Sequence, residues 1–215
     1  MMNFYKSIPK SIFPLLIVAV ILNILRLVVW GKSSFVFILW NIFLSFIPFI
    51  ISYLLLFFSK KENPNKIIFT IGIFLWILFI PNAPYIITDF IHLSLVRGVP
   101  VLFDICLLFS SASVGLILGF NSLFHIEQIL KIKYTSKITS LIMGVVILVI
   151  SFGVYLGRFL RFNSWDIFIN HTLLIDNVFK IFTQSKTHIE VYLYTLLFFF
   201  FLILSYKSWK FSNIK

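Results

Sequence analysis

Long, uninterrupted runs of apolar residues alternate with short polar and basic segments along this chain. A helix needs about 20 apolar residues to cross a bilayer, whereas a barrel strand is about half as long and alternates in polarity. The runs here are continuous and close to helical length, so they predict transmembrane helices. We expect six spans: Ile12–Trp30, Phe35–Phe58, Ile67–Ile80 with an extension, Val101–Phe120, Ile138–Gly157 and Ile189–Tyr206.

The third run is too short to cross the membrane by itself. It stops after about 14 residues at Pro81-Asn82-Ala83-Pro84, and at 1.5 Å per residue this length does not span the hydrocarbon core. Tyr85–Leu93 can resume a helix, because a proline is tolerated in a first turn. Free N–H groups at such a break form an anion site if they line a cavity, and a simple proline kink is the alternative.

Composition agrees with this pattern. Hydrophobic residues make up 60% of the 215 residues, charged residues 12%, and the mean hydropathy is +1.06, which excludes an ordinary soluble domain. No linker divides the chain, so the sequence predicts an all-α, polytopic transmembrane bundle forming one domain over residues 1–215. The first run follows Lys6 and Lys10 as in a signal peptide, but it is long and lacks a small-residue cleavage site, so we expect an uncleaved span. Cys106 lies in the fourth run and is expected to pack.

The net charge of +11 does not indicate nucleic acid, because the basic residues punctuate apolar runs and there set the orientation. Six spans with the N-terminus inside place eleven basic residues in the cytoplasm, all lysines, and seven outside, including all four arginines. The termini are therefore predicted to be cytoplasmic. The inner set is Lys6, Lys10, Lys60, Lys61, Lys66, Lys131, Lys133, Lys137, Lys207, Lys210 and Lys215; the outer set is Arg26, Lys32, Arg97, Arg158, Arg161, Lys180 and Lys186.

Polar residues inside the spans share one predicted depth. Such groups are costly in hydrocarbon and usually face protein or water, and with this orientation they converge on the outer half. They also fall on helical stripes of small and polar residues, which are typical of helix interfaces in membranes, so simple helix association is the alternative to a site. The residues are Asn23, Arg26, Asn41, Asn82, Asp104 and Arg158, and the stripes are Asn41, Ser45, Pro48 and Ser52, and Asp104, Ser111 and Gly115.

Two groups of residues carry candidate chemistry on this face. On the resumed helix Tyr85, Asp89 and His92 share one side, so a carboxylate and an imidazole can couple as an acid–base pair. At the end of the fifth span, Arg158 and Arg161 follow Gly153 and Gly157, and their planar guanidinium groups suit phosphate or carboxylate.

The segment after these arginines is too polar to span. Asn163 or Ser164 is expected to cap a following helix with Asp166 in its first turn, and Trp165–Phe182 is predicted to lie in the outer interface. At the inner side, Asn121–Lys137 with His125 and Glu127 is expected to be an exposed connector. The sequence contains no Walker, H-E-x-x-H, G-x-S-x-G or paired-cysteine spacing, so we expect no metal and no cofactor.

The chain resembles a family of uncharacterised bacterial multi-pass membrane proteins, domain of unknown function 1361. The resemblance rests on Pro81-Asn82-Ala83-Pro84-Tyr85, Thr88-Asp89 and His92-Leu93, and on Gly157-Arg158-Phe159-Leu160-Arg161. It implies a protein of the bacterial cytoplasmic membrane, and it transfers no catalytic or binding residue.

The leading hypothesis is an outward-facing site that binds or translocates an anionic lipid or cell-envelope intermediate. Membrane lipids are then its partners, and oligomeric state is left open. One alternative is a membrane enzyme acting on a lipid-linked substrate. The other is a structural or accessory subunit, whose charges form buried pairs such as Asp104 with Arg158. The candidate ligand-binding residues are Arg158, Arg161, Asn82, Tyr85, Asp104 and Asp166, and the candidate catalytic residues are Asp89 and His92.

Overall fold

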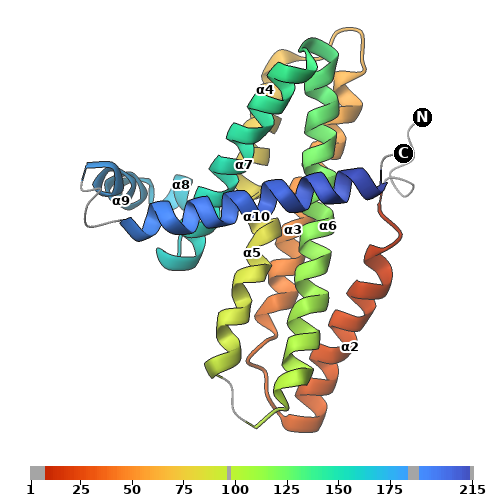
Figure 1. The fold of residues 1–215 in the computed structure, drawn as a ribbon, viewed down its shortest axis with the longest axis vertical. Coiled ribbons are helices and arrows are strands. Elements are labelled where there is room, and N and C mark those ends of the chain that lie inside the picture. The colour runs from red at the N-terminus through yellow and green to blue at the C-terminus, as the bar shows by residue number, and fades with distance from the viewer. Residues whose placement is uncertain (1–7, 96–97, 184–188, 214–215) are drawn as a thin grey trace. The chain divides into compact units, whose positions relative to one another are not determined.

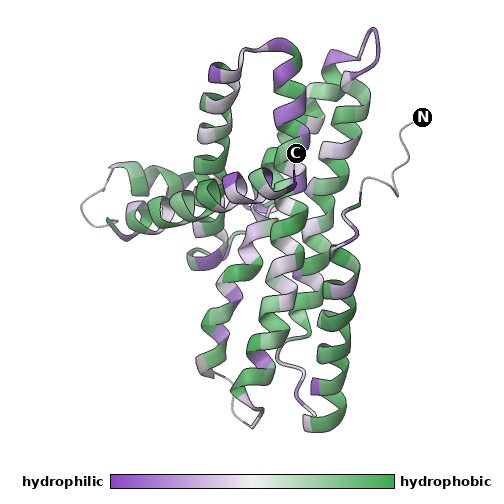
Figure 2. Cartoon of the chain, turned by 45° about the vertical axis from the view of Figure 1, so that its right-hand side comes forward, coloured by the Kyte–Doolittle hydropathy of each residue, from purple (hydrophilic) through white to green (hydrophobic). Residues whose placement is uncertain are grey.

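The computed structural model describes residues 8–95, 98–183 and 189–213, and its regular elements over these ranges are all helical. Six helices are long and apolar enough to cross a membrane: Ile12–Trp30, Phe37–Ser59, Lys66–Leu93, Val101–Lys133, Ser136–Phe159 and Ile189–Asn213. Apolar residues cover most of their length (Figure 2). The expected all-α bundle with six spans is therefore confirmed, and the chain is a multi-pass membrane protein.

By contacts the chain divides into two compact units, Met1–Thr135 and Ser136–Lys215. The expectation of a single integral membrane domain stays a prediction. So does the orientation, for which Lys6, Arg97, Lys186 and Lys215 lie outside the described residues.

Unit 1 is built around one long helix. Its elements are α2 (Ile12–Trp30), α3 (Phe37–Ser59), α4 (Lys66–Phe79), α5 (Asn82–Tyr85), the 3₁₀-helix η1 (Ile86–Leu95) and α6 (Val101–Lys133). Helix α6 packs along α3 and also contacts α2, α5 and η1, whereas α4 lies against α3 (Figure 1). Apolar side chains from three helices fill the space between them, among them Ala19, Ile38, Leu107, Val114 and Leu118, all with 0% exposure.

Small polar side chains form part of the buried interior of α3 and α6, as the stripes predict. Ser45, Ser52 and Ser111 are all 0% exposed. Each hydroxyl donates to a carbonyl of its own helix: Ser45 to Ile42 at 2.6 Å, Ser52 to Phe49 at 2.9 Å and Ser111 to Leu107 at 2.8 Å. Such bonding removes the cost of an unpaired hydroxyl in an apolar interior while keeping the helix surface small.

The third span is broken where the prolines predict. Helix α4 ends at Phe79, α5 begins at Asn82, and the ten residues of η1 wind as a 3₁₀-helix, a form that seldom exceeds three or four residues. The helix resumes earlier than expected, because the amides of Ala83 and Tyr85 bond to the carbonyls of Ile80 and Pro81, both at 3.1 Å. These two N–H groups are thus already occupied in the turn.

Two glycines of α6 allow the broken segment to pack closely against this helix. A Cβ atom on Gly115 would lie 2.4 Å from the Ala83 carbonyl oxygen and 2.9 Å from Cδ1 of Ile86, and one on Gly119 would lie 3.1 Å from Cβ of Ala83. The first distance is to backbone, which cannot swing aside as a side chain can. Glycine at 115 is therefore required for α5 to approach α6 this closely.

Helix α6 corrects two expectations from the sequence. It does not stop near Phe120 but continues to Lys133, so the predicted exposed connector is wrong. His125 and Glu127 are only 8% and 5% exposed. Cys106, which was expected to pack, is exposed.

Unit 2 contains α7 (Ser136–Phe159), α8 (Asp166–Ile169), α9 (His171–Thr183) and α10 (Ile189–Asn213). Helix α10 packs against α7, and α8 against α9. The helix expected over Trp165–Phe182 is in fact two, because the backbone leaves the helical region at Asn170. On α9 the exposed Phe179 and Phe182 lie on a different face from Lys180, as in a helix at a membrane interface.

Candidate functional site

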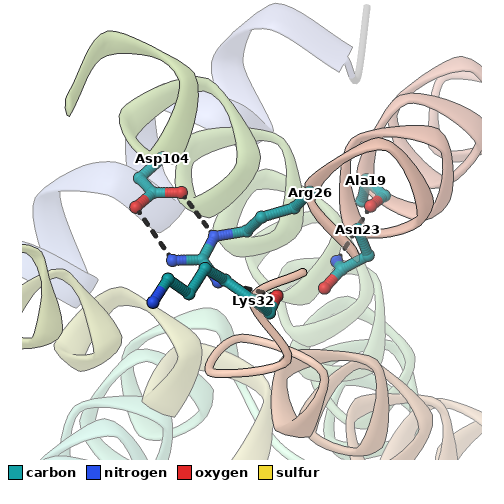
Figure 3. A network of polar contacts seen from close by, with 5 residues as sticks. All are labelled: Ala19, Asn23, Arg26, Lys32 and Asp104. Atoms are coloured by element: carbon teal, nitrogen blue, oxygen red, sulfur yellow. Dashed lines mark hydrogen bonds and ion pairs between the residues drawn. The ribbon is translucent and has the colours of Figure 1, made fainter. Parts of the chain in front are cut away.

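A buried ion pair joins α2 to α6 in unit 1. Arg26 is 1% exposed and Asp104 3%. Nε of Arg26 donates to Oδ1 of Asp104 at 2.7 Å, and a second guanidinium nitrogen donates to Oδ2 at 3.2 Å (Figure 3). The remaining nitrogen donates to the Lys32 carbonyl at 3.0 Å, and the guanidinium lies 4.4 Å from the Phe35 ring centroid. All three nitrogens of Arg26 are therefore engaged.

The pair gives Asp104 a specific partner that the sequence analysis missed. Both of its oxygens are bound by Arg26, so the partner of Asp104 is Arg26, whereas the accessory alternative had named Arg158. Residues 19, 23 and 26 lie four and three apart in α2, and Asn23 donates to the Ala19 carbonyl at 2.9 Å. This spacing puts them on one helix face and would have indicated that Arg26 faces protein.

Asp89 and His92 lie on one face of η1, as predicted. Because a 3₁₀-helix has three residues per turn, side chains three apart are eclipsed. Asp89 is 1% exposed, and Oδ2 accepts a hydrogen bond of 2.9 Å from the side-chain amide of Asn41 on α3. The half-buried His92 ring lies 5.4 Å from the Phe37 ring centroid, also on α3. Helix α3 thus holds both candidate catalytic residues.

Asn82 and Tyr85 take part in the backbone of the break. The Asn82 side chain donates to the Phe79 carbonyl at 2.9 Å, which closes the end of α4. The Tyr85 carbonyl accepts from the Thr88 hydroxyl at 2.6 Å. Both side chains are half-buried, and their assignment to ligand binding stays a prediction.

In unit 2 the two arginines mark the end of α7. Arg158 lies in the last turn, and the chain then reverses with the Phe162 amide bonded to the Leu156 carbonyl at 3.2 Å. Arg161 has φ 58°, the only left-handed non-glycine residue over the described ranges. Glycine is usual at such a position, and another residue there costs about 1–2 kcal/mol. The Arg161 side chain is exposed and makes no hydrogen bond or ion pair with the residues that the structure describes.

The Asp166 carboxylate accepts hydrogen bonds from residues on both sides of it along the chain. It is 6% exposed and accepts from the backbone amide of Asn163 at 2.6 Å, from the Asn163 side chain at 3.4 Å and from Asn170 at 3.0 Å. The N-cap of α8 is Trp165, which makes no side-chain cap bond, rather than the expected Asn163 or Ser164, whereas Asp166 lies in the first turn as predicted. A carboxylate three residues along instead reaches back to the Asn163 amide, as in half of a capping box.

Aromatic rings gather at the end of α7, in the turns that precede Arg161. The rings of Tyr155 and Phe159 on α7 stack at 4.9 Å, and Phe159 lies 4.5 Å from Tyr194 on α10. Phe159 and Tyr194 remain 43% and 41% exposed. Amphipathic aromatic side chains are enriched at the level of lipid headgroups, so this cluster supports a headgroup depth for Arg158.

The predicted site residues fall into two groups. Asn82, Tyr85, Asp89, His92 and Asp104 belong to unit 1, and Arg158, Arg161 and Asp166 belong to unit 2. Over the part of the chain that the structure describes, no three His, Cys, Asp or Glu side chains group as for a metal ion.

Both motif regions lie within a match to a known family. The sequence model for "protein of unknown function (DUF1361)" matches residues 40–205, more than half of the chain. This chain belongs to the DUF1361 family. In this DUF1361 protein the match includes Asp104 but begins after α2, so it leaves out Arg26. No curated protein and no solved structure matches the chain.

Proposed function

We propose that this DUF1361 protein binds the phosphate of an anionic lipid or a lipid-linked cell-envelope intermediate, with Arg158 and Arg161 as the binding residues. The observation that carries the proposal is the exposed arginine held in a left-handed backbone conformation at position 161. A purely structural chain reversal is served better by glycine. We attribute the presence of arginine at this position to the anion that its guanidinium binds.

The surroundings of the two arginines fit an anionic headgroup. A guanidinium forms paired hydrogen bonds with phosphate, and Arg158 and Arg161 lie only three positions apart at the end of an apolar helix. Arg158 alone has a structural explanation, because a cation in the last turn favours the helix dipole. Arg161 lies beyond the helix end, and the neighbouring aromatic cluster of Tyr155, Phe159 and Tyr194 is of the kind found at headgroup level.

A membrane enzyme acting on a lipid-linked substrate is the second candidate. It is supported by Asp89 and His92, which share one face of η1 and are both held from α3. An imidazole next to a carboxylate is suited to general acid–base catalysis. The accessory alternative is supported by the Arg26–Asp104 pair, in which each buried charge compensates the other.

Arg161 variants test the proposal in detergent with added lipid. Arg161→Gly relieves the backbone strain, so we expect the lipid-free protein to be stabilised by about 1 kcal/mol. It should lose most of the thermal stabilisation that phosphatidylglycerol gives the wild type over phosphatidylcholine. Arg161→Lys keeps the charge but not the planar fork, and should retain only part of it. Lys180→Gln, which removes an exposed cation from α9, is the matched control.

An Arg161→Gly protein with the full wild-type response to phosphatidylglycerol would contradict the proposal. Extracted lipids from cells with and without the protein separate the two leading functions. A changed covalent lipid species favours the enzyme, whereas unchanged chemistry with a lost lipid response in Arg161→Gly favours binding or translocation.

A further inference from the structure

A second ionisable site belongs to unit 1, whereas the arginines of α7 belong to unit 2. His125 on α6 is 8% exposed, and its Nδ1 lies 3.0 Å from the hydroxyl of Ser52 on α3, which is 0% exposed. The imidazole also packs 5.5 Å from the Phe49 ring and 6.1 Å from the Tyr53 ring. An ionisable side chain inside a membrane span is expensive and usually functional.

A hydrogen-bonded cluster one turn away fixes the helices around this histidine. The indole N–H of Trp76 on α4 donates to the Ser122 hydroxyl at 2.7 Å, and Ser122 donates to the Pro48 carbonyl on α3 at 3.0 Å. Trp76 is 1% exposed and Ser122 0%. Three helices are thus joined by polar contacts next to His125, so a change of charge there acts on a well-packed junction.

Among the residues that the structure describes, no ion pair joins the His125 imidazole to a group of opposite charge. On α6, Glu127 forms an ion pair with Lys131 at 2.8 Å, and α3 contributes Tyr53. Asp104, bound to Arg26, lies 21 residues away from His125 along α6, which is about 30 Å at 1.5 Å per residue. The remaining titratable groups on the described helices of unit 1 are Cys106 and Lys133 on α6, Lys66 on α4, Tyr85 on α5, and Asp89 and His92 on η1.

We propose that the Ser52–His125 pair is a proton-binding site, and that protonation of His125 loosens the packing of α3 against α6. The neutral ring satisfies one nitrogen through Ser52 and places its faces among aromatic side chains. The charged ring has the same hydroxyl and aromatic neighbours, which offset only part of the cost of a buried charge. Packing is therefore tight when the imidazole is neutral and weakens as the pH falls. The pair lies in the half of α6 that the lysine pattern assigns to the cytoplasm.

Thermal unfolding of the purified full chain between pH 5 and 8 tests this site. A single linked proton changes stability by at most about 1.4 kcal/mol per pH unit, which is about 3–5 °C in a protein of this size. We expect the wild-type midpoint to fall by about this amount per unit on the acidic side. His125→Gln should remove most of the fall, and His171→Gln, which changes an exposed histidine on α9, should keep it.

His125→Phe provides a second variant if the glutamine protein does not fold, because it fills the site without a titratable group. In wild-type protein labelled at histidine, NMR should in addition show one imidazole signal that is absent from His125→Phe and changes with pH independently of the signal that is absent from His171→Gln. Equal acid sensitivity in wild type, His125→Phe and His171→Gln would overturn the proposal. So would a His125 resonance that titrates together with that of His171.

Discussion

Breaking the Arg26–Asp104 pair should destabilise unit 1 strongly. Arg26 makes two hydrogen bonds to Asp104 and a third to the Lys32 carbonyl, and both partners are almost completely buried. Removing one partner leaves an uncompensated charge, which costs about 3–5 kcal/mol. In a protein of this size this corresponds to a lower unfolding midpoint by about 6–20 °C. We expect Arg26→Met and Asp104→Leu each to show this loss.

The double variant separates the pair from its individual side chains. Replacing a buried ion pair by apolar residues is often neutral or stabilising, so Arg26→Met with Asp104→Leu should recover most of the loss of either single variant. Lys32→Met removes an exposed charge beside the pair and should stay close to wild type. The assay is thermal unfolding in one detergent at one ionic strength. Single variants that each lose less than about 1 kcal/mol, or losses that simply add in the double variant, would refute a closed buried pair.

Two further predictions concern packing and topology. Gly115→Ala should lower the free energy of unfolding by about 1–3 kcal/mol, because the added carbon overpacks against a backbone carbonyl of α5. Gly144→Ala, with nothing within 4 Å of the added carbon, should be neutral or slightly stabilising. Equal effects of the two variants would contradict the close approach of α5 to α6. Single cysteines introduced by Asn63→Cys and Phe168→Cys in a Cys106→Ala background should react with an impermeant reagent from the cytoplasmic and the outer side respectively, and the opposite pattern would refute the predicted orientation.

The pattern of apolar runs was sufficient to predict the spans, because the lipid core requires apolar side chains at the positions that face it. Pro81 and Pro84 likewise predicted the break, since the missing amide groups act locally. Such features depend on one segment and one solvent, so they can be deduced from a single sequence.

Features that depend on several helices could not be deduced in the same way. His125 and Glu127 looked like residues of an exposed connector because they are polar. They are buried because α6 continues and α3 supplies a hydroxyl at Ser52. The partner of Asp104 is 78 residues away along the chain, and the predicted membrane depth alone was compatible with more than one arginine as that partner. Asp166 was correctly assigned to the first turn of a helix, but its carboxylate accepts a hydrogen bond from the preceding Asn163 amide, which the sequence did not predict.

The unusual winding of η1 has a geometric consequence for Asp89 and His92. A 3₁₀-helix rises about 2.0 Å per residue and an α-helix about 1.5 Å, so the ten residues of η1 cover about 20 Å and would cover about 15 Å if rewound as an α-helix. The same rewinding would turn each residue about 20° less around the axis. Over the three steps from Asp89 to His92 this rotates the imidazole about 60° away from the line of the carboxylate. A change from 3₁₀ to α winding would therefore shorten this segment by about 5 Å and, at the same time, move the Asp89 and His92 side chains apart around the helix axis.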